Sequence, residues 1–458
     1  MAGETRATAC GDFAADFVED RLSNLCDPKS GVQTGPFGSQ LHQEDYVTVG
    51  TPIITVEHLG ENRIFHEDVP KVSDEDKERL SKYTLRKGDI VFSRVGSVDR
   101  RALVRDAEAG WLFSGRCLRV RPDLNKIDSG YLSYFFGLQS FKEHIRAIAV
   151  GATMPSLNTQ LLSDVVVPHP QNLSEQRAIA HILGALDDKI ELNRKMNETL
   201  EAMAQAIFKS WFVDFDPVRA KAEGRQPIGL DPEIVKLFPD SFQTSELGRI
   251  PTGWHITDFP EEIDFLEGPG LRNWQYRDAG MKFLNIRCIV DGDLDIAKAN
   301  AISLEEFEKT YSHFALREDD IVISTSGTIG RLAIVRSDHL PVMLNTSIIR
   351  MCGRDPVGLA YVWGLLQSVY FLEEMFALAV GSVQLNFGPM HLRKIKVLRP
   401  PDDVLRNFEK VATPLIRKTL HNRRESRTLA TIRDALLPKL LSGEIRVKDA
   451  EKFVEKRQ

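Results

Sequence analysis

The sequence has few cysteines and no long apolar run. Its five cysteines are scattered among 458 residues, and none of them forms a C-x-x-C pair. This spacing argues against a dense disulfide framework and against a cysteine-based zinc site. No stretch reaches the roughly 18 uncharged apolar residues that a membrane-spanning helix needs. The first residues lack the basic and apolar segments of a secretion signal. We therefore expect a cytoplasmic protein with no membrane association.

The short motifs of common catalytic sites are also missing. The sequence contains no G-x-x-x-x-G-K-[ST] phosphate loop, no G-x-G-x-x-G, no H-E-x-x-H and no G-x-S-x-G. It also lacks the Asn-Pro-Pro-aromatic run with which amino-methylating enzymes hold their target amine. The eleven histidines lie apart, and the carboxylate clusters are typical of solvated surfaces. These absences predict a binding protein that is not itself an enzyme and that holds no metal.

The charge of the chain does not decide whether its partner is nucleic acid. A net charge of −6 disfavours nucleic acid. However, residues 86–121 contain 9 Lys and Arg against 4 Asp and Glu, and residues 391–458 contain 18 against 9. A local excess of positive charge can be a binding surface or only a solvated face.

The chain consists of two similar halves. LRKGDIVFSRVG, which begins at Leu85, shares 7 of 12 residues with LREDDIVISTSG, which begins at Leu316, at an offset of 231. VVVPHP recurs as IKVLRP at an offset of 230, and KIELNRKMNETL recurs as KTLHNRRESRTL at an offset of 229. Because the order is preserved and the offset is nearly constant, the sequence predicts a duplicated protein.

Each half begins with short β-rich runs between turns and continues into a long helical stretch. We therefore expect a mixed α/β fold, with two pseudo-repeated globular domains separated by two long helices. The predicted segments are a first domain over 1–172, a helix over 173–212, a linker over 213–245, a second domain over 246–401, a helix over 402–441 and a tail over 442–458. The linker is predicted from its prolines, and the charged tail is predicted to be frayed.

The two long helices are predicted to carry matching apolar rows. Ser174 is the expected N-cap of the first helix, with Glu175 in its first turn. Heptad spacing places Ile179, Leu186, Asn193, Leu200 and Ile207 in one row, and Phe408, Leu415, Asn422, Leu429 and Leu436 in the corresponding row of the second helix. A second row, three residues further on, contains Ile182, Met196, Met203, Val411 and Ile432, and it is interrupted by Lys189, Lys418 and Glu425.

Asn193 and Asn422 interrupt the first row at equivalent positions. A buried Asn in such a row fixes the register of paired helices at some cost in stability. If the helices run antiparallel, two-fold symmetry would place an Asn193–Asn422 pair at the centre. The alternative is that each helix is amphipathic and packs only on its own domain. Pro414 either starts the second helix or kinks it.

Two small polar loops recur in both halves and are the candidate binding surfaces. Short hydroxyls and backbone N–H groups suit phosphate contacts, and Arg suits phosphates or guanine edges. The candidate DNA contacts are Ser93, Arg94, Ser97, Arg100, Arg101, Thr153, Ser156 and Asn158 in the first half, and Ser324, Thr325, Ser326, Thr328, Arg331, Gln384 and Asn386 in the second. The simpler alternative is that these loops are only hairpin turns. Loops that recur on a duplicated scaffold with different side chains would suit two unlike half-sites.

Four segments resemble a known family. SEQRAIAHILGALDDKIELNRKMNETLEAMAQAIFKSWFVDFDPVRAKAEG, from Ser174, is similar to the central conserved region of the specificity subunits of type I restriction–modification enzymes. Other recurring segments of this family resemble ELGRIPTGW from Glu246, LRKGDIVFS from Leu85 and RESRTLATIRDALLPKLLSGEI from Arg424. The first half has no obvious counterpart of IPTGW, so the start of the first domain stays open.

The resemblance implies a DNA-specificity subunit without catalytic activity. Each of its two target-recognition domains would read one half of an asymmetric, bipartite site in double-stranded DNA. Its two helices would pair as an antiparallel coiled coil and set the spacing between the half-sites. The subunit would recruit two modification subunits, which methylate adenine with S-adenosylmethionine, and restriction subunits, which translocate and cut DNA with ATP and Mg. No cofactor is expected in this chain itself.

Two other classes of function stay open. The chain could be a nuclease or methyltransferase with an unrecognised motif, and the purified chain would then be active alone. It could also be a scaffold that binds two copies of a partner without any preference for DNA sequence. The target sequence and the gap between its halves depend on loop geometry and on DNA deformability, and the residues do not reveal either of them.

Overall fold

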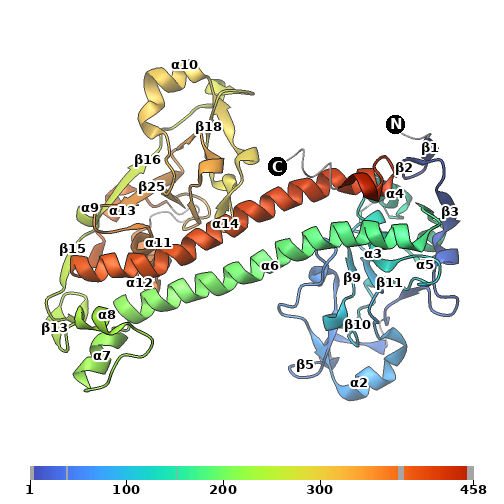
Figure 1. Ribbon diagram of the computed structural model, residues 1–458, viewed down its shortest axis with the longest axis horizontal. Coiled ribbons are helices and arrows are strands. Elements are labelled where there is room, and N and C mark those ends of the chain that lie inside the picture. The colour runs from blue at the N-terminus through green and yellow to red at the C-terminus, as the bar shows by residue number, and fades with distance from the viewer. Residues whose placement is uncertain (1–4, 38–39, 152, 380–385, 451–458) are drawn as a thin grey trace. The chain divides into compact units, whose positions relative to one another are not determined.

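The computed structural model describes residues 5–37, 40–151, 153–379 and 386–450 (Figure 1). The chain divides into two compact units. Unit 1 consists of residues 1–191 and 427–458, and unit 2 consists of residues 192–426. Each unit therefore contains part of both long helices in addition to its globular part.

Unit 1 is built on two four-stranded sheets. The first has the order β4-β11-β8-β9 and is antiparallel, with strands Val32–Thr34, Cys117–Val120, Ile90–Ser93 and Arg101–Leu103. The second has the order β10-β6-β7-β5, with strands Leu112–Phe113, Thr51–Ile54, Lys71–Val72 and Tyr46–Val47. Only its pair β10 and β6 is parallel.

Unit 2 repeats both sheets in the same order. The first is β16-β25-β22-β23, with strands Ile263–Glu267, Ile348–Gly353, Ile321–Ser324 and Leu332–Ile334. The second is β17-β21-β18-β24, with strands Tyr276–Arg277, Asn300–Ile302, Met281–Phe283 and Val342–Met343. Its pair β18 and β24 is parallel, like β6 and β10 in unit 1. The duplication and the mixed α/β class predicted from the sequence are confirmed.

The recurring DIVFS and DIVIS segments form the central strands because they are apolar on both faces. Ile90 and Phe92 of β8 point into the core beside the helices, whereas Val91 points into a second core. The side chains of a strand alternate between its two faces, so a continuous apolar run can serve two cores at once.

Helices pack against one face of the first sheet in each unit. They are α3 (Ser129–Phe135), α4 (Gln139–Ile148) and α5 (Thr159–Ser163) in unit 1, and α11 (Leu359–Gln367), α12 (Val369–Leu378) and α13 (Pro389–Leu392) in unit 2. Smaller elements are α1 (Leu22–Leu25), α2 (Asp74–Arg79), α7 (Asp216–Ala222), α8 (Pro232–Lys236), α9 (Phe259–Glu262) and α10 (Leu304–Glu306). Two-stranded pairs join β3 (Val18–Arg21) to β12 (Val166–His169), β15 (His255–Asp258) to β26 (Lys396–Arg399), and β19 (Ile289–Val290) to β20 (Asp293–Leu294).

The structure supplies the counterpart of IPTGW that the sequence comparison did not find. The hairpin β1–β2 (Thr5–Thr8 and Gly11–Ala14) corresponds to β13–β14 (Phe242–Ser245 and Gly248–Pro251). Each hairpin is followed three residues later by a buried aromatic residue, Phe17 in unit 1 and Trp254 in unit 2. The sequence GDFAADF hid this match because only the turn and the apolar positions are shared.

The predicted linker and tail both pack against globular cores. Within residues 213–245, Phe215, Val218 and Phe238 are buried in the core of unit 2. In the tail, Ile445 and Val447 pack on the core of unit 1, and Arg446 forms ion pairs. The expectation of a frayed tail is wrong for residues 444–450, because Ile445 and Val447 are half-buried against the core and Ala450 is buried.

The long helices are α6 (Leu173–Phe212) and α14 (Asp402–Leu441), each 40 residues long. The backbone N–H of Ser174 donates to Asn172 Oδ1 at 2.8 Å, so Asn172 caps α6 and the predicted cap at Ser174 is wrong. Pro414 does not start α14, because the helix begins twelve residues earlier and Pro414 lies on its exposed side.

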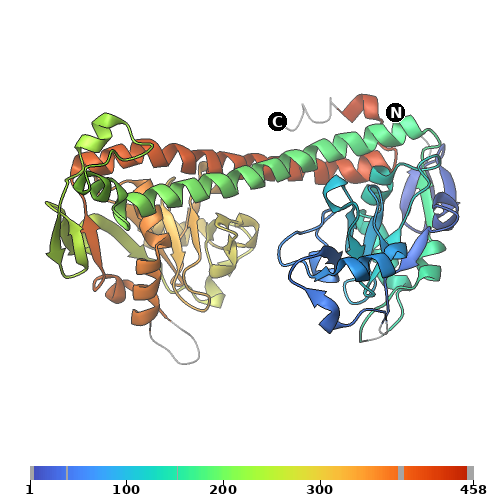
Figure 2. The ribbon, with the colours of Figure 1, turned by 90° about the horizontal axis from the view of Figure 1, so that it is seen from below.

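Within each unit the two helices lie side by side and run antiparallel (Figures 1 and 2). In unit 2, Asn193 contacts Ser426 and Glu201 contacts Arg423, so the partner's number falls as the number along α6 rises. In unit 1, Asp187 pairs with Arg433. The predicted helix pair is confirmed, and the alternative of two separate amphipathic helices is excluded.

The second apolar row was predicted in the wrong phase for part of its length, because Ile432 is buried whereas other members of the row are exposed. Met203 and Val411 of the predicted row are exposed by 48% and 36%. The buried row lies four residues after the first row and includes Leu183 of α6 and Ala412 and Leu440 of α14. Spacings of three and four residues share a helix face. The interruptions at Lys189 and Lys418 were the signal that the row was misplaced.

Charged contacts attach the globular parts to the helices with opposite polarity in the two units. In unit 1 the helix supplies the carboxylate, because Asp188 of α6 accepts hydrogen bonds from Arg63 at 3.1 Å and Arg105 at 2.7 Å. Partial burial acts to raise the pKa of Asp188, but these two guanidiniums lower it below its usual value. In unit 2 the helix supplies the cation, because Arg417 of α14 pairs with Asp319 through both carboxylate oxygens.

Two neighbouring aspartates of α6 provide a matched test of these contacts. Asp187 is buried and accepts from Tyr134 Oη and Arg433 Nη1, each at 2.7 Å. We expect Asp187→Asn to lower the free energy of unfolding by about 3 kcal/mol, because Arg433 loses its buried counter-ion. Asp188→Asn, at an exposed pair, should cost about 1 kcal/mol or less. Urea unfolding followed by circular dichroism measures both, and equal losses would contradict this assignment.

Candidate nucleic-acid interface

The two predicted loops of each half lie next to each other in the folded units. In unit 1 an antiparallel bridge joins Val95 of the first loop to Ser156 of the second. In unit 2 the equivalent bridge joins Ser326 to Asn386. The sequence offered no signal for this contact, because about 60 residues separate the loops in each half.

An equivalent backbone hydrogen bond supports the bridge in each unit. Leu157 N donates to the carbonyl of Arg94 at 2.9 Å, and Phe387 N donates to the carbonyl of Thr325 at 2.9 Å. Leu157 and Phe387 are buried and secure the second loop. Each unit thus presents one continuous surface made of two loops, on a backbone that is common to both units.

The exposure of the candidate residues differs widely. Ser97, Arg100, Thr153, Asn158, Thr328, Arg331 and Asn386 are exposed, whereas Arg94, Ser156 and Ser326 are half-buried. Asn158 has a structural task as well, because its Oδ1 caps α5 by accepting from Leu161 N at 2.8 Å. Gln384 lies outside the described residues. The exposed residues are the part of the prediction that a ligand can reach.

Four candidates are buried and support the loops from within. Ser93 Oγ donates to the Val95 carbonyl at 3.0 Å, and Ser324 Oγ donates to the Thr328 carbonyl at 2.6 Å. These hydroxyls hold the turn that follows each central strand. Thr325 is also buried, with 1% of its surface exposed. We therefore leave Ser93, Ser324 and Thr325 out of the proposed contact surface.

Arg101 is the fourth buried candidate. Its side chain is 2% exposed, its Nε donates to the Ser133 carbonyl at 3.1 Å, and its guanidinium pairs with Glu61. The adjacent Arg100 is exposed instead. Neighbouring residues of a strand face opposite sides, so only one arginine of this pair can point outward.

Arg94 is held against an aromatic ring. Its guanidinium lies 4.8 Å from the centre of the Phe37 ring, and its Nη1 donates to the Gly115 carbonyl at 3.3 Å. Such a cation–π contact fixes the side chain without neutralising its charge. Phe37 was not among the predicted site residues, because it is 57 positions away from Arg94 in the sequence.

Asn193 and Asn422 are both fully buried where α6 and α14 meet in unit 2. Asn193 Nδ2 donates to Glu425 Oε2 at 2.8 Å and lies 3.4 Å from the Asn422 carbonyl. Asn422 Nδ2 donates to Asn197 Oδ1 at 2.9 Å. The contact between the two positions is thus from side chain to backbone. Among the described residues, both Oδ1 atoms are buried without a hydrogen-bond partner.

These buried amides should lower the free energy of unfolding, and they should fix the register of α6 against α14. We expect Asn193→Leu combined with Asn422→Leu to raise the free energy of unfolding by about 1–2 kcal/mol, because the unpaired Oδ1 atoms are removed together with their donors. The control Asn197→Leu removes the acceptor of Asn422 and should lower it by about 1–3 kcal/mol. Thermal unfolding compares the three proteins. A double variant less stable than the natural protein would contradict the expected role.

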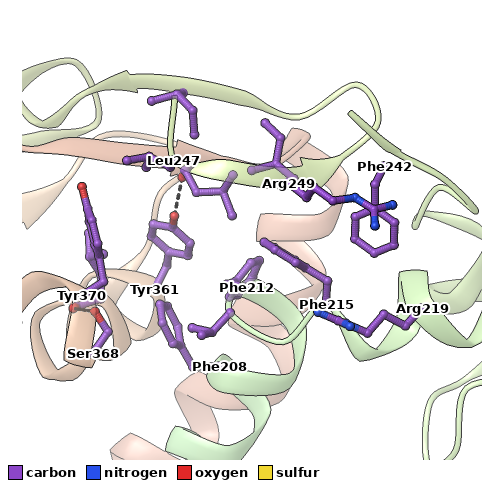
Figure 3. Close-up of a pocket in the computed structure, with 15 residues that line it drawn as sticks. Phe208, Phe212, Phe215, Arg219, Phe242, Leu247, Arg249, Tyr361, Ser368 and Tyr370 are labelled. Carbon is purple, nitrogen blue, oxygen red and sulfur yellow. Dashed lines mark hydrogen bonds between the residues drawn. The ribbon is translucent and has the colours of Figure 1, made fainter. Parts of the chain in front are cut away.

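Unit 2 also has an apolar pocket of about 320 Å³ beside the end of α6 (Figure 3). Phe208, Phe212 and Phe215 line it, and Tyr361 Oη donates to the Leu398 carbonyl. Burial raises the pKa of Tyr361, and it raises the pKa of Tyr370 to about 12. Both phenols therefore keep their protons at neutral pH, and neither is suited to act as a base.

The described residues also bear on metal and membrane binding. Among them, no three His, Cys, Asp or Glu side chains are grouped as metal ligands would be. In the same part of the chain, every helix is too short or too polar to span a membrane. All five cysteines are free thiols, and burial raises the pKa of Cys10 to about 11 and that of Cys26 to about 12.

Comparisons with known proteins agree with the repeated architecture. Residues 31–202 match the family described as type I restriction modification DNA specificity domain. The chain is 26% identical over 436 residues to the type I restriction enzyme HindI specificity subunit of Haemophilus influenzae, which covers 84% of this chain and 92% of that one. It is 28% identical over 325 residues to the MjaIX specificity subunit of Methanocaldococcus jannaschii, covering 70% of each.

Along most of its length the chain is thus similar to type I restriction enzyme specificity subunits. A crystal structure of a type I restriction–modification S subunit from M. genitalium has the same fold, with a TM-score of 0.60 over 93% of this chain and 96% of that one at 16% identity. Specificity subunits are the non-catalytic members of these systems. On this ground the prediction that the chain is not itself an enzyme is confirmed.

Proposed function

We propose that this specificity subunit reads an asymmetric, bipartite site in double-stranded DNA, with one half-site contacted by each unit. The observation that carries the proposal is the paired-loop surface, which recurs on the same backbone in both units. Some side chains of this surface are shared, because Arg100 corresponds to Arg331 and Ser97 to Thr328. Others differ, because Asn386 of unit 2 corresponds to Ser156 of unit 1. Equivalent surfaces with different chemistry suit two different base sequences.

The paired helices α6 and α14 set the distance between the half-sites and dock the partner subunits. A helix of 40 residues is about 60 Å long, which exceeds the ~34 Å of one DNA turn. Exposed apolar side chains on the helices, Met203 and Val411, support a docking role. Val411 also borders a groove of about 540 Å³ with the exposed Ile228.

The partners of the proposed complex are two modification subunits and the restriction subunits, which act in the cytoplasm. S-adenosylmethionine, ATP and Mg would be bound by those partners, and this chain would hold no cofactor. Recruitment of a methylating partner makes the proposal measurable, because the recognised site is then marked by methylated adenine.

Methylome sequencing tests this proposal directly. Cells that contain this chain with its methylating partner are compared with cells that contain only the partner. We expect a new adenine-methylated motif with two defined halves and a fixed gap. No new motif from an assembled complex would favour a protein scaffold. Nuclease or methyl-transfer activity of the purified chain alone would favour an enzyme.

Loop variants should change one half of the motif and leave the other unchanged. We expect Ser97→Ala with Thr153→Ala to relax base preference in one half-site, and Thr328→Ala with Asn386→Ala in the other. A lost base contact costs about 1–3 kcal/mol of discrimination, roughly tenfold or more in the ratio of methylated sequences. The two double variants are controls for each other. Equal relaxation of both halves by one variant would contradict the assignment.

The gap between the two half-sites should shorten when the same number of residues is removed from facing positions of α6 and α14. Deleting residues 190–196 and 423–429 removes one heptad around the contact between Asn193 and Ser426 from both helices. Each helix becomes about 10 Å shorter, which corresponds to about three base pairs at 3.4 Å each. We expect the methylated motif to keep both halves and to lose about three positions from its gap. Deletion in α6 alone is the control and should abolish methylation. An unchanged gap would contradict a spacing role.

A further inference from the structure

A basic surface of unit 2 extends beyond the predicted site residues. It is a shallow concavity beside the β19–β20 hairpin, bordered by Arg287, Lys298, Asn300 and Arg331. Arg331 belongs to the first predicted loop, so the concavity continues the paired-loop surface. The Arg287, Lys298 and Arg331 side chains are exposed.

The two arginines of the concavity are held by neutral acceptors. Arg287 Nε donates to the Lys298 carbonyl at 3.0 Å, and its Nη2 donates to Asn300 Oδ1. Arg331 Nη1 lies 3.4 Å from the Ile289 carbonyl. These acceptors orient both guanidiniums and leave their positive charge in place. Lys298 pairs with Asp295 at 3.1 Å, and both side chains stay partly exposed.

The equivalent surface of unit 1 has the opposite charge. The strand pairs Thr51–Val72 and Met281–Ile302 fix the correspondence of this region at an offset of 230. Glu57 therefore occupies the position of Arg287, and Asp68 occupies the position of Lys298. Of the three cations, only Arg331 has a basic counterpart, Arg100.

This reversal indicates that the basic surface serves a ligand rather than the fold. The two units share sheet order and loop bridges, so their common backbone tolerates either charge at these positions. Two oriented guanidiniums and an ammonium around an open concavity are suited to a phosphate, which Arg can bind through paired hydrogen bonds.

We propose that Arg287, Lys298 and Arg331 bind one phosphate of the DNA backbone, and that unit 1 has no equivalent site. The proposal rests on the proposed function of the chain in DNA recognition. A phosphate contact positions the protein and carries no base information. Unit 2 thus supplies more of the sequence-independent affinity, and unit 1 relies more on contacts made by its loops.

The test uses the full chain assembled with its methylating partner and a fluorescein-labelled duplex of mixed sequence. Fluorescence anisotropy gives the dissociation constant over a salt series from about 50 to 200 mM. We expect Arg287→Gln with Arg331→Gln to weaken binding roughly tenfold at low salt. It should also make the negative slope of log K against log salt shallower by about 0.9, which is the value for one phosphate.

Two further variants sharpen the test. Arg277→Gln replaces an exposed arginine of unit 2 that donates to the carbonyls of Trp274 and Tyr276, and it should leave affinity and slope unchanged. Glu57→Arg with Asp68→Lys in unit 1 recreates the cations at equivalent positions, and it should strengthen binding and raise the slope by about 0.9. Circular dichroism melting confirms that each variant is folded.

The outcomes separate this proposal from the proposed function. If the natural complex binds the duplex and Arg287→Gln with Arg331→Gln binds with the same affinity and slope, the phosphate site is overturned, while DNA recognition by the loops stands. The phosphate site is also overturned as a DNA contact if inorganic phosphate competes with the duplex for the natural complex but not for the double variant, while the double variant keeps its affinity for the duplex. If the natural complex binds no duplex even at low salt, the proposed function fails and the phosphate site fails with it.

Discussion

Each unit of this protein completes its core with a helix segment from the other repeat. Ile432, Leu436 and Leu440 of α14 are buried in the core of unit 1, and Phe208 and Trp211 of α6 are buried in the core of unit 2. Neither repeat contains the whole of its own core. The antiparallel pairing of α6 with α14 is therefore a condition for folding both globular parts, and it is more than a connection between them.

The sequence was sufficient to predict the architecture and the central polar positions of the two long helices. A constant offset of about 230 residues predicted the duplication, and regular spacing predicted both helices and the burial of Asn193 and Asn422. Two features could be assigned only from the structure. The phase of the second row was ambiguous because spacings of three and four share a face. The β1–β2 hairpin was missed because Phe17 replaces the tryptophan found at Trp254.

The candidate interface was predictable only as far as its segments. Small polar residues after a buried strand marked both loops, but the same residue types also stabilise turns. Whether Ser93 or Ser97 faces solvent depends on strand alternation and on where the turn begins, and composition does not reveal this. The bridges between the loops, and the contact of Arg94 with Phe37, join residues far apart in the sequence. The basic concavity could have been found by aligning the halves and comparing charge at each position.

The opposite polarity of the ion pairs between helix and globular part has a consequence for any exchange of the two globular parts by recombination. If an exchange moved the first globular part onto the segment of α14 that holds the second, Arg63 and Arg105 would face Arg417 where they now face Asp188. Cation would then meet cation at this contact. A productive exchange must therefore carry the adjoining turns of helix with it, so the smallest inheritable module is a globular part together with its stretch of helix.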